Sequence, residues 1–470
     1  MTRKILTILG YALLTMLVLL VTAGLVAYGQ GYTYDFKTGK LTQDGLVIIV
    51  SSPSGAAVSL EGKDLNKKTE FRKLYEPGSY TFELNKPGFK TWSKTLTVTA
   101  GGVGLAQYVI LTPNSPKTTV LDERQTILAQ AMTKDHNHLV YVVGGDQAGV
   151  YVSDIGGGVK KVFAVPVPEK DKLPEILVSV SWSDDGSHLL VVTQAGAATA
   201  TAGAAKVYRV MSVDGGDVVN LTDQYKFDFA GLTFSQNNWK RLYWAAGGDL
   251  RRVDLDAKAV SGVLADKVTQ VFPSGDRLLY VRADITGYSL WNLDSSDKPQ
   301  PVVAALTPSS SYDVALTSYN GQDELAVVPA STRVGLLYTG IFGSTPTTQT
   351  ITQNVDRSSF SPDGHLLAFY SSDEIAVYDF EKSDFLKQRT TYLFPKVTAL
   401  RQLTWFDNFH VVLNENGRIV WSEFDGDNAR DLGAAYAEFP AYGSNDNRSV
   451  IGLFDYGVGR VRSEQLLLKP

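Results

Sequence analysis

One pattern recurs between residues 118 and 470, at a spacing of about 40–50 residues. Each copy starts with a short strand that ends in a bulky residue. A polar turn then leads into a very apolar strand, and a third strand ends near an acidic residue. Internal repeats of this length are typical of propellers and solenoids, in which each unit buries the apolar face of its neighbour. The repeat therefore predicts an all-β repeat architecture for most of the chain.

The copies align over their first two strands and again over the third. The two best copies read Ser-Trp-Ser-Asp-Asp-Gly at 181–186 and Ser-Phe-Ser-Pro-Asp-Gly at 359–364, and His-Leu-Leu follows in both. Other copies begin at residues 234, 272 and 404, and weaker ones begin near Met132, Leu316 and Tyr442. The third strands align at residues 149–154, 250–254, 289–294, 375–379 and 418–423.

Eight such units can be counted. Seven are followed by a plausible fourth strand, whereas the eighth ends the chain at residues 466–468. Residues 117–122 (KTTVLD), just before the first unit, are the candidate for the missing strand. A ring that borrows this strand leaves no exposed edge. We therefore expect a closed eight-bladed β-propeller over residues 114–470. Seven blades are the alternative, because the copies near Met132 and Tyr442 are the weakest.

The repeat is similar to the TolB-type propeller repeat, which itself resembles WD repeats. Residues 361–369 (SPDGHLLAF) carry the resemblance most clearly. The resemblance implies a propeller and says almost nothing about activity, because propellers serve as enzymes, receptors and scaffolds alike.

Residues 5–28 form an uncharged, mostly apolar run of 24 residues. About 20 apolar residues suffice to cross a bilayer as a helix. Arg3 and Lys4 precede the run, so the positive-inside rule predicts a cytoplasmic N-terminus and an extracytoplasmic remainder. A cleaved signal peptide is the alternative, but its apolar region would be shorter and would end at a better small-residue site. We expect a single-pass anchor over residues 1–28 and a polar juxtamembrane segment over 29–45.

Residues 46–113 alternate between apolar and polar positions in five expected strands. Tyr80, Phe82 and Leu84 fall on one face by the two-residue period of a strand. Turns are expected at residues 61–62, 76–78 and 86–88. The pattern predicts a small antiparallel β-sandwich with strands at residues 46–52, 57–63, 79–84, 92–99 and 105–111.

This stretch resembles the PEGA domain family. The matching residues are 53–56 (PSGA), 58–62 (VSLEG), 77–80 (PGSY) and 88–89 (GF). Ser54 stands where the family motif has glutamate, and Lys68-Thr69 lies near the place of the usual Thr-Pro. The resemblance implies a surface or periplasmic β-sandwich that accompanies other domains and has no known catalysis of its own.

Charge and cysteine content exclude several functions. The chain has no cysteine, which removes disulfides, thiolate catalysis and zinc-thiolate sites. The net charge is −5, and no basic stripe is apparent beyond the extreme N-terminus, which argues against a nucleic-acid partner. No G-x-S-x-G elbow or Walker A loop occurs, and the glycines at 101–104 lie between two expected strands, where they open no helix.

The histidines are the first candidates for a functional site. Four of the five fall at one repeat position, where the first turn enters the second strand: His138, His188, His365 and His410. His136 forms an H-x-H pair with His138. Equivalent positions on different blades are spread around a ring and do not readily converge on one metal ion, which needs bonds of about 2.1 Å. We therefore interpret them as turn residues and predict no metal site.

Acidic and aromatic residues are the remaining candidates. The pairs Asp185-Gly186 and Asp363-Gly364 suit tight turns better than calcium loops, and Asp425, Asp427 and Asp431 form a weak carboxylate cluster. One aromatic register could be a sugar-stacking ladder, but packing between blades is the favoured interpretation. Residues 195–205 form a small-residue loop, interpreted as a tolerated insertion and alternatively as a mobile flap. The aromatic register comprises Trp182, Phe234, Phe272, Phe360 and Trp405.

These observations favour a membrane-anchored binding or scaffold protein of the cell envelope. Its propeller would dock a protein partner, or a cell-surface glycan. No catalytic, cofactor-binding or metal-binding residue is predicted. The alternative is an envelope hydrolase or lyase acting on polysaccharide, with two carboxylates about 5–10 Å apart at the propeller axis.

Overall fold

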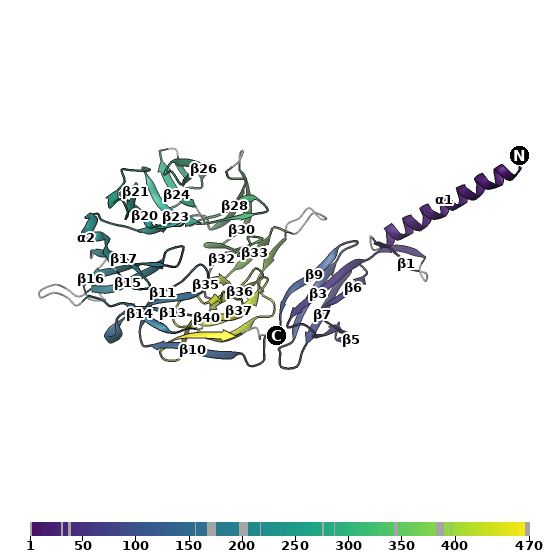
Figure 1. The fold of residues 1–470 in the computed structure, drawn as a ribbon, viewed down its shortest axis with the longest axis horizontal. Coiled ribbons are helices and arrows are strands. Elements are labelled where there is room, and N and C mark those ends of the chain that lie inside the picture. Colours follow the sequence, from purple (N-terminus) through teal and green to yellow (C-terminus); the bar gives the residue numbers. More distant parts are fainter. Residues whose placement is uncertain are drawn as a thin grey trace. The chain divides into compact units, whose positions relative to one another are not determined.

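The computed structural model describes residues 2–29, 32–35, 39–155, 157–166, 175–196, 205–216, 218–274, 277–285, 287–342, 346–381, 390–395 and 397–465. Two compact units divide the chain, one comprising Met1–Pro116 and the other Lys117–Gln465 (Figure 1). Residues 466–468, expected to end the last blade, and most of the loop at 195–205 lie outside the described residues.

The first unit begins with helix α1 (Thr2–Gly29). Within it, Leu9–Gly29 is long and apolar enough to cross a membrane, and none of that stretch is buried against the rest of the described chain. A signal sequence near the N-terminus also meets this criterion of length and composition. The next segment was expected to be a polar juxtamembrane stretch, and its described residues form a hairpin of β1 (Tyr32–Asp35) and β2 (Lys40–Gln43).

A two-sheet sandwich follows, with strand orders β6-β3-β9 and β5-β4-β7-β8. Its core includes Val47, Ile49, Phe82, Leu84 and Trp92, so the alternation predicted for Phe82 and Leu84 is confirmed. The strands are β3 (Gly45–Ser52), β4 (Ala57–Leu60), β5 (Lys63–Lys68), β6 (Phe71–Tyr75), β7 (Gly78–Asn85), β8 (Trp92–Val98) and β9 (Val103–Ile110).

The sandwich differs from the expected one in two ways. It has seven strands, because β5 and β6 are edge strands whose residues are mostly exposed and polar and therefore lack an apolar alternation. It is also not wholly antiparallel, since β3 and β9, the first and last strands, pair in parallel. The two strands can run in parallel because the chain crosses to the other sheet and returns between them.

Basic residues gather at β5 and β6, which corrects the expectation that no basic stripe lies beyond the N-terminus. Lys67, Lys68, Arg72 and Lys73 line one groove of about 420 Å³ together with Glu70. In the sequence these cations are interrupted by other residues. They come together because both strands lie at sheet edges and one short connection joins them. We call these four cations the basic edge.

The second unit is a ring of eight four-stranded antiparallel sheets (Figure 1). The innermost strand of each sheet is its first, since the first strands of neighbouring sheets contact one another. A short helix α2 (Leu221–Tyr225) follows β18, and a 3-10 turn (Gly145–Gln147) joins β12 to β13. Blades 1 to 4 are β11 (Ile127–Met132), β12 (His138–Val143), β13 (Gly149–Asp154) and β14 (Val159–Phe163); β15 (Glu175–Trp182), β16 (His188–Ala195), β17 (Lys206–Ser212) and β18 (Val219–Asn220); β19 (Thr233–Ser235), β20 (Asn238–Ala246), β21 (Asp249–Asp254) and β22 (Ala259–Val260); β23 (Val268–Ser274), β24 (Arg277–Asp284), β25 (Gly287–Leu293) and β26 (Pro299–Leu306).

The remaining blades confirm the predicted closure. Blade 8 has the order β10-β41-β40-β39, so the segment that contains residues 117–122 pairs with the last strand of the chain. The weak copies near Met132 and Tyr442 are true blades, and the ring has eight. Blades 5 to 8 are β27 (Tyr312–Tyr319), β28 (Gln322–Pro329), β29 (Val334–Thr339) and β30 (Thr347–Gln353); β31 (Arg357–Phe360), β32 (Leu366–Tyr370), β33 (Ile375–Asp379) and β34 (Thr390–Leu393); β35 (Leu400–Trp405), β36 (His410–Glu415), β37 (Arg418–Glu423) and β38 (Arg430–Ala434); β39 (Tyr442–Gly443), β40 (Ser449–Asp455), β41 (Gly459–Gln465) and β10 (Lys117–Arg124).

A hydroxyl organises the turn between the first and second strands. Ser183 Oγ donates to Asp185 Oδ1 at 2.6 Å and accepts the His188 N–H at 2.9 Å. A side chain that bonds its own backbone in this way stabilises a tight turn. Hydroxyls at Thr133, Ser361 and Ser444 accept the N–H five residues later in the same way.

The repeated aromatics pack between blades, as the sequence analysis favoured. Trp182 donates its indole N–H to the Ala131 carbonyl of blade 1 at 3.0 Å, and Trp405 donates to Ser359 of blade 6 at 3.3 Å. Phe234 is buried in a cluster shared by blades 2 and 3. Phe272 and Phe360 pack against the clusters shared by blades 4 and 5 and by blades 5 and 6.

Candidate functional site

Connections between first and second strands, and between third and fourth, lie on one face of the ring, which we call the turn face. On it, a hollow of about 280 Å³ is lined by turns of blades 1, 2 and 3, including Met132, Trp182 and Thr233. A second hollow of about 440 Å³ adjoins it, because Asp184 and Gln236 line both. The two form one groove, called here the turn groove, across three blades.

The turn groove has both polar and apolar walls, and Trp239 lies at its end. Lys134 of blade 1 forms an ion pair with Asp184 of blade 2 at 3.0 Å. Trp239 is half-buried and stacks on His188 with ring centroids 3.4 Å apart. Burial lowers the pKa of His188, so this imidazole is neutral at pH 7. Asn237 is exposed at the rim. Carboxylate, amide and indole groups of this kind bind polar ligands or peptide backbone.

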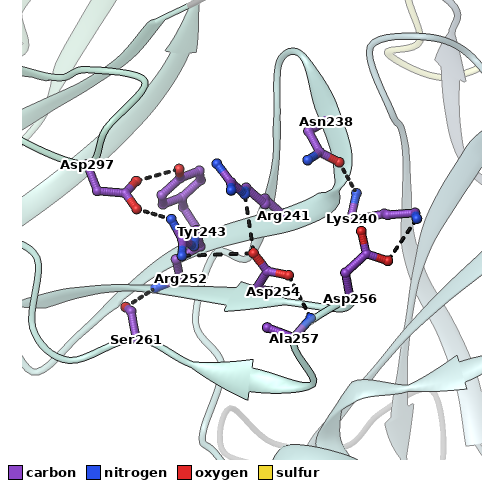
Figure 2. Close-up of polar contacts among 10 residues, drawn as sticks. All are labelled: Asn238, Lys240, Arg241, Tyr243, Arg252, Asp254, Asp256, Ala257, Ser261 and Asp297. Carbon is purple, nitrogen blue, oxygen red and sulfur yellow. Dashed lines mark hydrogen bonds and ion pairs between the residues drawn. The ribbon is translucent and has the colours of Figure 1, made fainter.

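A charged cluster joins blades 3 and 4 on the same face (Figure 2). Arg241 Nε lies 3.3 Å from Asp254 Oδ2, and Arg252 forms an ion pair with Asp297. Tyr243 donates its hydroxyl to Asp297 at 2.9 Å. Asp297 lies between β25 and β26 of blade 4, so these bonds connect blade 3 to blade 4.

The electrostatics of the cluster indicate a structural role. The backbone N–H of Ala257 lowers the pKa of Asp254, and Arg241 and Arg252 act in the same direction against partial burial. Burial raises the pKa of Tyr243. The carboxylate is therefore ionised and the phenol protonated at pH 7, so neither group has the near-neutral pKa of a general base or acid.

The histidines lie on four blades, with His136 and His138 both on blade 1, and they bond locally. His138 Nδ1 lies 2.7 Å from Asp154, His365 Nδ1 lies 2.6 Å from Asp363, and His410 Nδ1 lies 2.8 Å from Asp407. His136 Nδ1 lies 2.7 Å from the Gly443 carbonyl of blade 8. Each of these imidazoles therefore stabilises a turn within its blade or a contact with the neighbouring blade.

One detail of the histidine alignment was wrong. His138, His188 and His410 open β12, β16 and β36, whereas Leu366 opens β32 and His365 precedes it. In each turn a serine hydroxyl accepts the backbone N–H of the residue five positions later. That residue is His188 after Ser183 and Leu366 after Ser361, so Leu366 and not His365 is equivalent to His188.

The innermost strands carry two carboxylates within the described residues. Glu175 opens β15 and receives two hydrogen bonds from Arg209, at 2.7 and 2.8 Å, and one from Thr193 at 2.6 Å. Asp313 lies in β27 and accepts the Ser358 N–H and hydroxyl at 2.7 and 2.6 Å. Burial raises the pKa of Asp313. Glu175 is thus held within blade 2, whereas Asp313 joins blade 5 to blade 6, and both carboxylates serve packing.

The acidic residues Asp425, Asp427 and Asp431 of blade 7 do not form one cluster around a common ligand. Asp431 pairs with Arg418 at 2.6 Å, whereas Asp425 accepts the backbone N–H of Asp427 at 3.3 Å. Within the described residues, no group of three or more histidine or acidic side chains is placed to hold a metal ion. Gly101 and Gly102 lie in the turn between β8 and β9, where the Gly102 N–H donates to the Thr99 carbonyl at 3.0 Å, and Gly104 lies in β9.

Comparison with known families agrees with the sandwich. Residues 44–109 match the PEGA domain family, so this domain is a PEGA domain. The match covers 66 of 470 residues and places no family name on the whole chain. No curated protein matches the chain.

Solved structures similar to the chain are β-propellers with little sequence likeness. The Dos1 propeller is 12% identical with a TM-score of 0.47, over 76% of this chain and 95% of that one. Porphyromonas gingivalis dipeptidyl peptidase 4 is 11% identical with a TM-score of 0.46, over 71% and 57%. PorZ, a surface component of the type-IX secretion system of the same organism, is 13% identical with a TM-score of 0.39, over 72% and 42%. Proteins of such different roles decide no activity for this chain.

Proposed function

We propose that this chain is a membrane-anchored binding protein of the cell envelope, held by α1, whose propeller docks a protein partner outside the cytoplasm at the turn groove. The proposed role is binding without catalysis. The observation that carries it is the groove itself, a continuous hollow that crosses turns of three blades. A docking surface on several blades is held rigidly, which lowers the ordering cost of binding.

The apolar stretch of α1 and the charges before it support the proposed location. α1 contains one apolar stretch of spanning length, and the only charges before it, Arg3 and Lys4, are positive. PEGA domains are often extracellular, which agrees with a chain that has no cysteine and does not depend on the redox state of its compartment.

Site-specific photocrosslinking in cells tests the proposal. A photoreactive amino acid replaces Asn237 on the groove rim in the full-length, anchored protein. The matched control places it at Ser372, an exposed residue between β32 and β33 and therefore on the opposite face. We expect a small, reproducible set of protein adducts from position 237 that is missing from position 372.

Two results would count against protein docking. Equal adducts from both positions would mean that the turn face has no preferred partner. Adducts that consist of carbohydrate instead of protein would replace the proposed partner with a cell-surface glycan. Protease protection of the propeller in spheroplasts, where only the cytoplasmic membrane remains sealed, would contradict the extracytoplasmic location.

A further inference from the structure

The basic edge of the PEGA domain differs from the charges of the propeller. Among the residues that the structure describes, Lys67, Lys68 and Arg72 form no ion pair or hydrogen bond through their side chains, and Glu70 on the same groove pairs with none of them. Cations that share a groove without counterions repel one another. They favour an anionic partner that the sandwich itself does not supply.

Propeller arginines behave in the opposite way. The propeller has 42 acidic and 32 basic residues, whereas the sandwich from Asp44 to Pro116 has six acidic and eight basic ones. Ion pairs hold many of the propeller guanidinium groups, and several of these pairs join neighbouring strands or blades. They include Arg209–Glu175, Arg252–Asp297, Arg277–Asp323, Arg333–Asp356 and Arg418–Asp431.

An apolar sheet face adjoins the basic edge. In the sheet β6-β3-β9, Leu46 of β3 stands between Leu74 of β6 and Val103 of β9. In the next row, Ile48 stands between Arg72 and Leu105. These side chains point away from the core, which receives the alternate residues of β3.

The exposure of this face is large for apolar side chains. Val103 is 57% exposed, Leu105 48% and Leu74 37%. Aliphatic residues in adjacent rows make a contiguous patch, and such patches mark interaction surfaces. We call Leu46, Ile48, Leu74, Val103 and Leu105 the apolar face.

We propose that the apolar face and the basic edge lie on the surface of the membrane that holds α1, where Lys67, Lys68 and Arg72 bind the phosphates of anionic lipid headgroups. The inference rests on the proposed role of α1 as an anchor. Aliphatic side chains enter the headgroup boundary, while cations on their rim remain with the phosphates. A soluble polyanion would use the cations and leave the apolar rows exposed to water.

Chain length permits this contact. Residues 30–44 separate α1 from β3. Fifteen residues span at most about 50 Å when fully extended, so the sandwich stays within reach of the lipid surface. The negative surface of an anionic leaflet attracts nearby cations, and each one strengthens the association about five-fold.

The lack of cysteine allows a clean test in the full-length protein. Leu105→Cys places a single fluorophore on the apolar face, and Thr97→Cys places one on the exposed outer side of β8, in the other sheet. Both proteins are reconstituted in vesicles of phosphatidylglycerol and phosphatidylcholine that contain lipids with a spin label. We expect the fluorophore at 105 to be quenched and the fluorophore at 97 to remain bright.

Charge variants separate lipid binding from simple proximity. Lys67→Gln, Lys68→Gln and Arg72→Gln together should lower the ratio of membrane-bound to free sandwich roughly 100-fold and restore the fluorescence at 105. The control triple, Lys206→Gln, Lys258→Gln and Lys298→Gln, removes the same charge from exposed propeller positions and should leave quenching unchanged.

The possible failures are distinguishable. Carbonate extraction that releases the wild-type protein would overturn the anchor and, with it, the proposed function. Retention of the protein with an unquenched fluorophore at 105 would overturn only the membrane contact. A fluorophore that is shielded from water but not quenched would mean that protein covers the apolar face, and this also overturns the inference.

Discussion

The pair of Glu175 and Arg209 gives the sharpest test of how the ring is held together. The Arg209 side chain is 8% exposed and that of Glu175 is 21% exposed, and two parallel hydrogen bonds join them. Glu175→Gln keeps the acceptor and removes the charge, which leaves a buried guanidinium without its counterion. Loss of one partner from such a pair costs about 3 kcal/mol in the free energy of unfolding.

Hydrogen exchange of the reconstituted protein measures this cost locally. A loss of about 3 kcal/mol lowers the protection of amides in β15 to β17 by about 150-fold. The matched control is Glu123→Gln, because Glu123 pairs with Arg460 at the surface, with side chains 50% and 33% exposed. We expect that control to cost at most about 1 kcal/mol. Equal effects of the two variants would refute the argument from burial.

The same pair predicts a dependence on pH. Burial would raise the pKa of Glu175, but hydrogen bonds from Arg209 and Thr193 outweigh it and hold that pKa below the ordinary value. The stabilisation is therefore complete above the unfolded-state pKa of about 4.3 and is lost as pH falls through the lower folded-state pKa. The difference in protection between wild type and Glu175→Gln should be constant near neutral pH and shrink in acid. A constant difference down to pH values well below 4 would contradict this.

Two further substitutions test the turns, with unfolding of the full-length protein in urea followed by tryptophan fluorescence. Gly364→Ala adds a Cβ at φ +80°, 2.8 Å from the Thr317 hydroxyl, whereas Gly340→Ala at φ +70° meets open space. We expect the first to cost about 2–3 kcal/mol and the second about 1 kcal/mol, and equal costs would show that the close contact relaxes freely. Ser361→Ala removes the buried hydroxyl of its turn and should cost about 1–3 kcal/mol, whereas the exposed Ser372→Ala should be neutral; a neutral Ser361→Ala would exclude this role for the hydroxyl.

Sequence reasoning predicted the ring well because a repeat supplies the same information eight times. A weak copy such as the one at Tyr442 gains support from its neighbours, and the count of strands required a closing strand, which β10 provides. The alignment failed at His365, where only a side-chain bond across the turn fixes the register. Hydrogen bonds of that kind have no periodicity in the sequence.

The turn groove and the basic edge could not be predicted in the same way. The groove combines residues of three blades that lie about 100 positions apart, from Met132 to Trp239. The basic edge depends on β5 and β6, which lack the alternation that marks a half-buried strand. In both cases the decisive property is which strands become neighbours, and this follows from topology.

The net charge of −5 illustrates what a whole-chain average conceals. It combines a propeller of net charge −10, a sandwich of +2 and a segment before the sandwich of +3, and the charges of the propeller and the sandwich have different uses. In the propeller, arginines such as Arg252 and Arg209 face carboxylates across strands and blades, so charge serves cohesion. In the sandwich, Lys67 and Lys68 face none, although Glu70 is close enough to line the same groove. Charge that folding does not use remains available for binding, and beside a membrane its natural partner is phosphate.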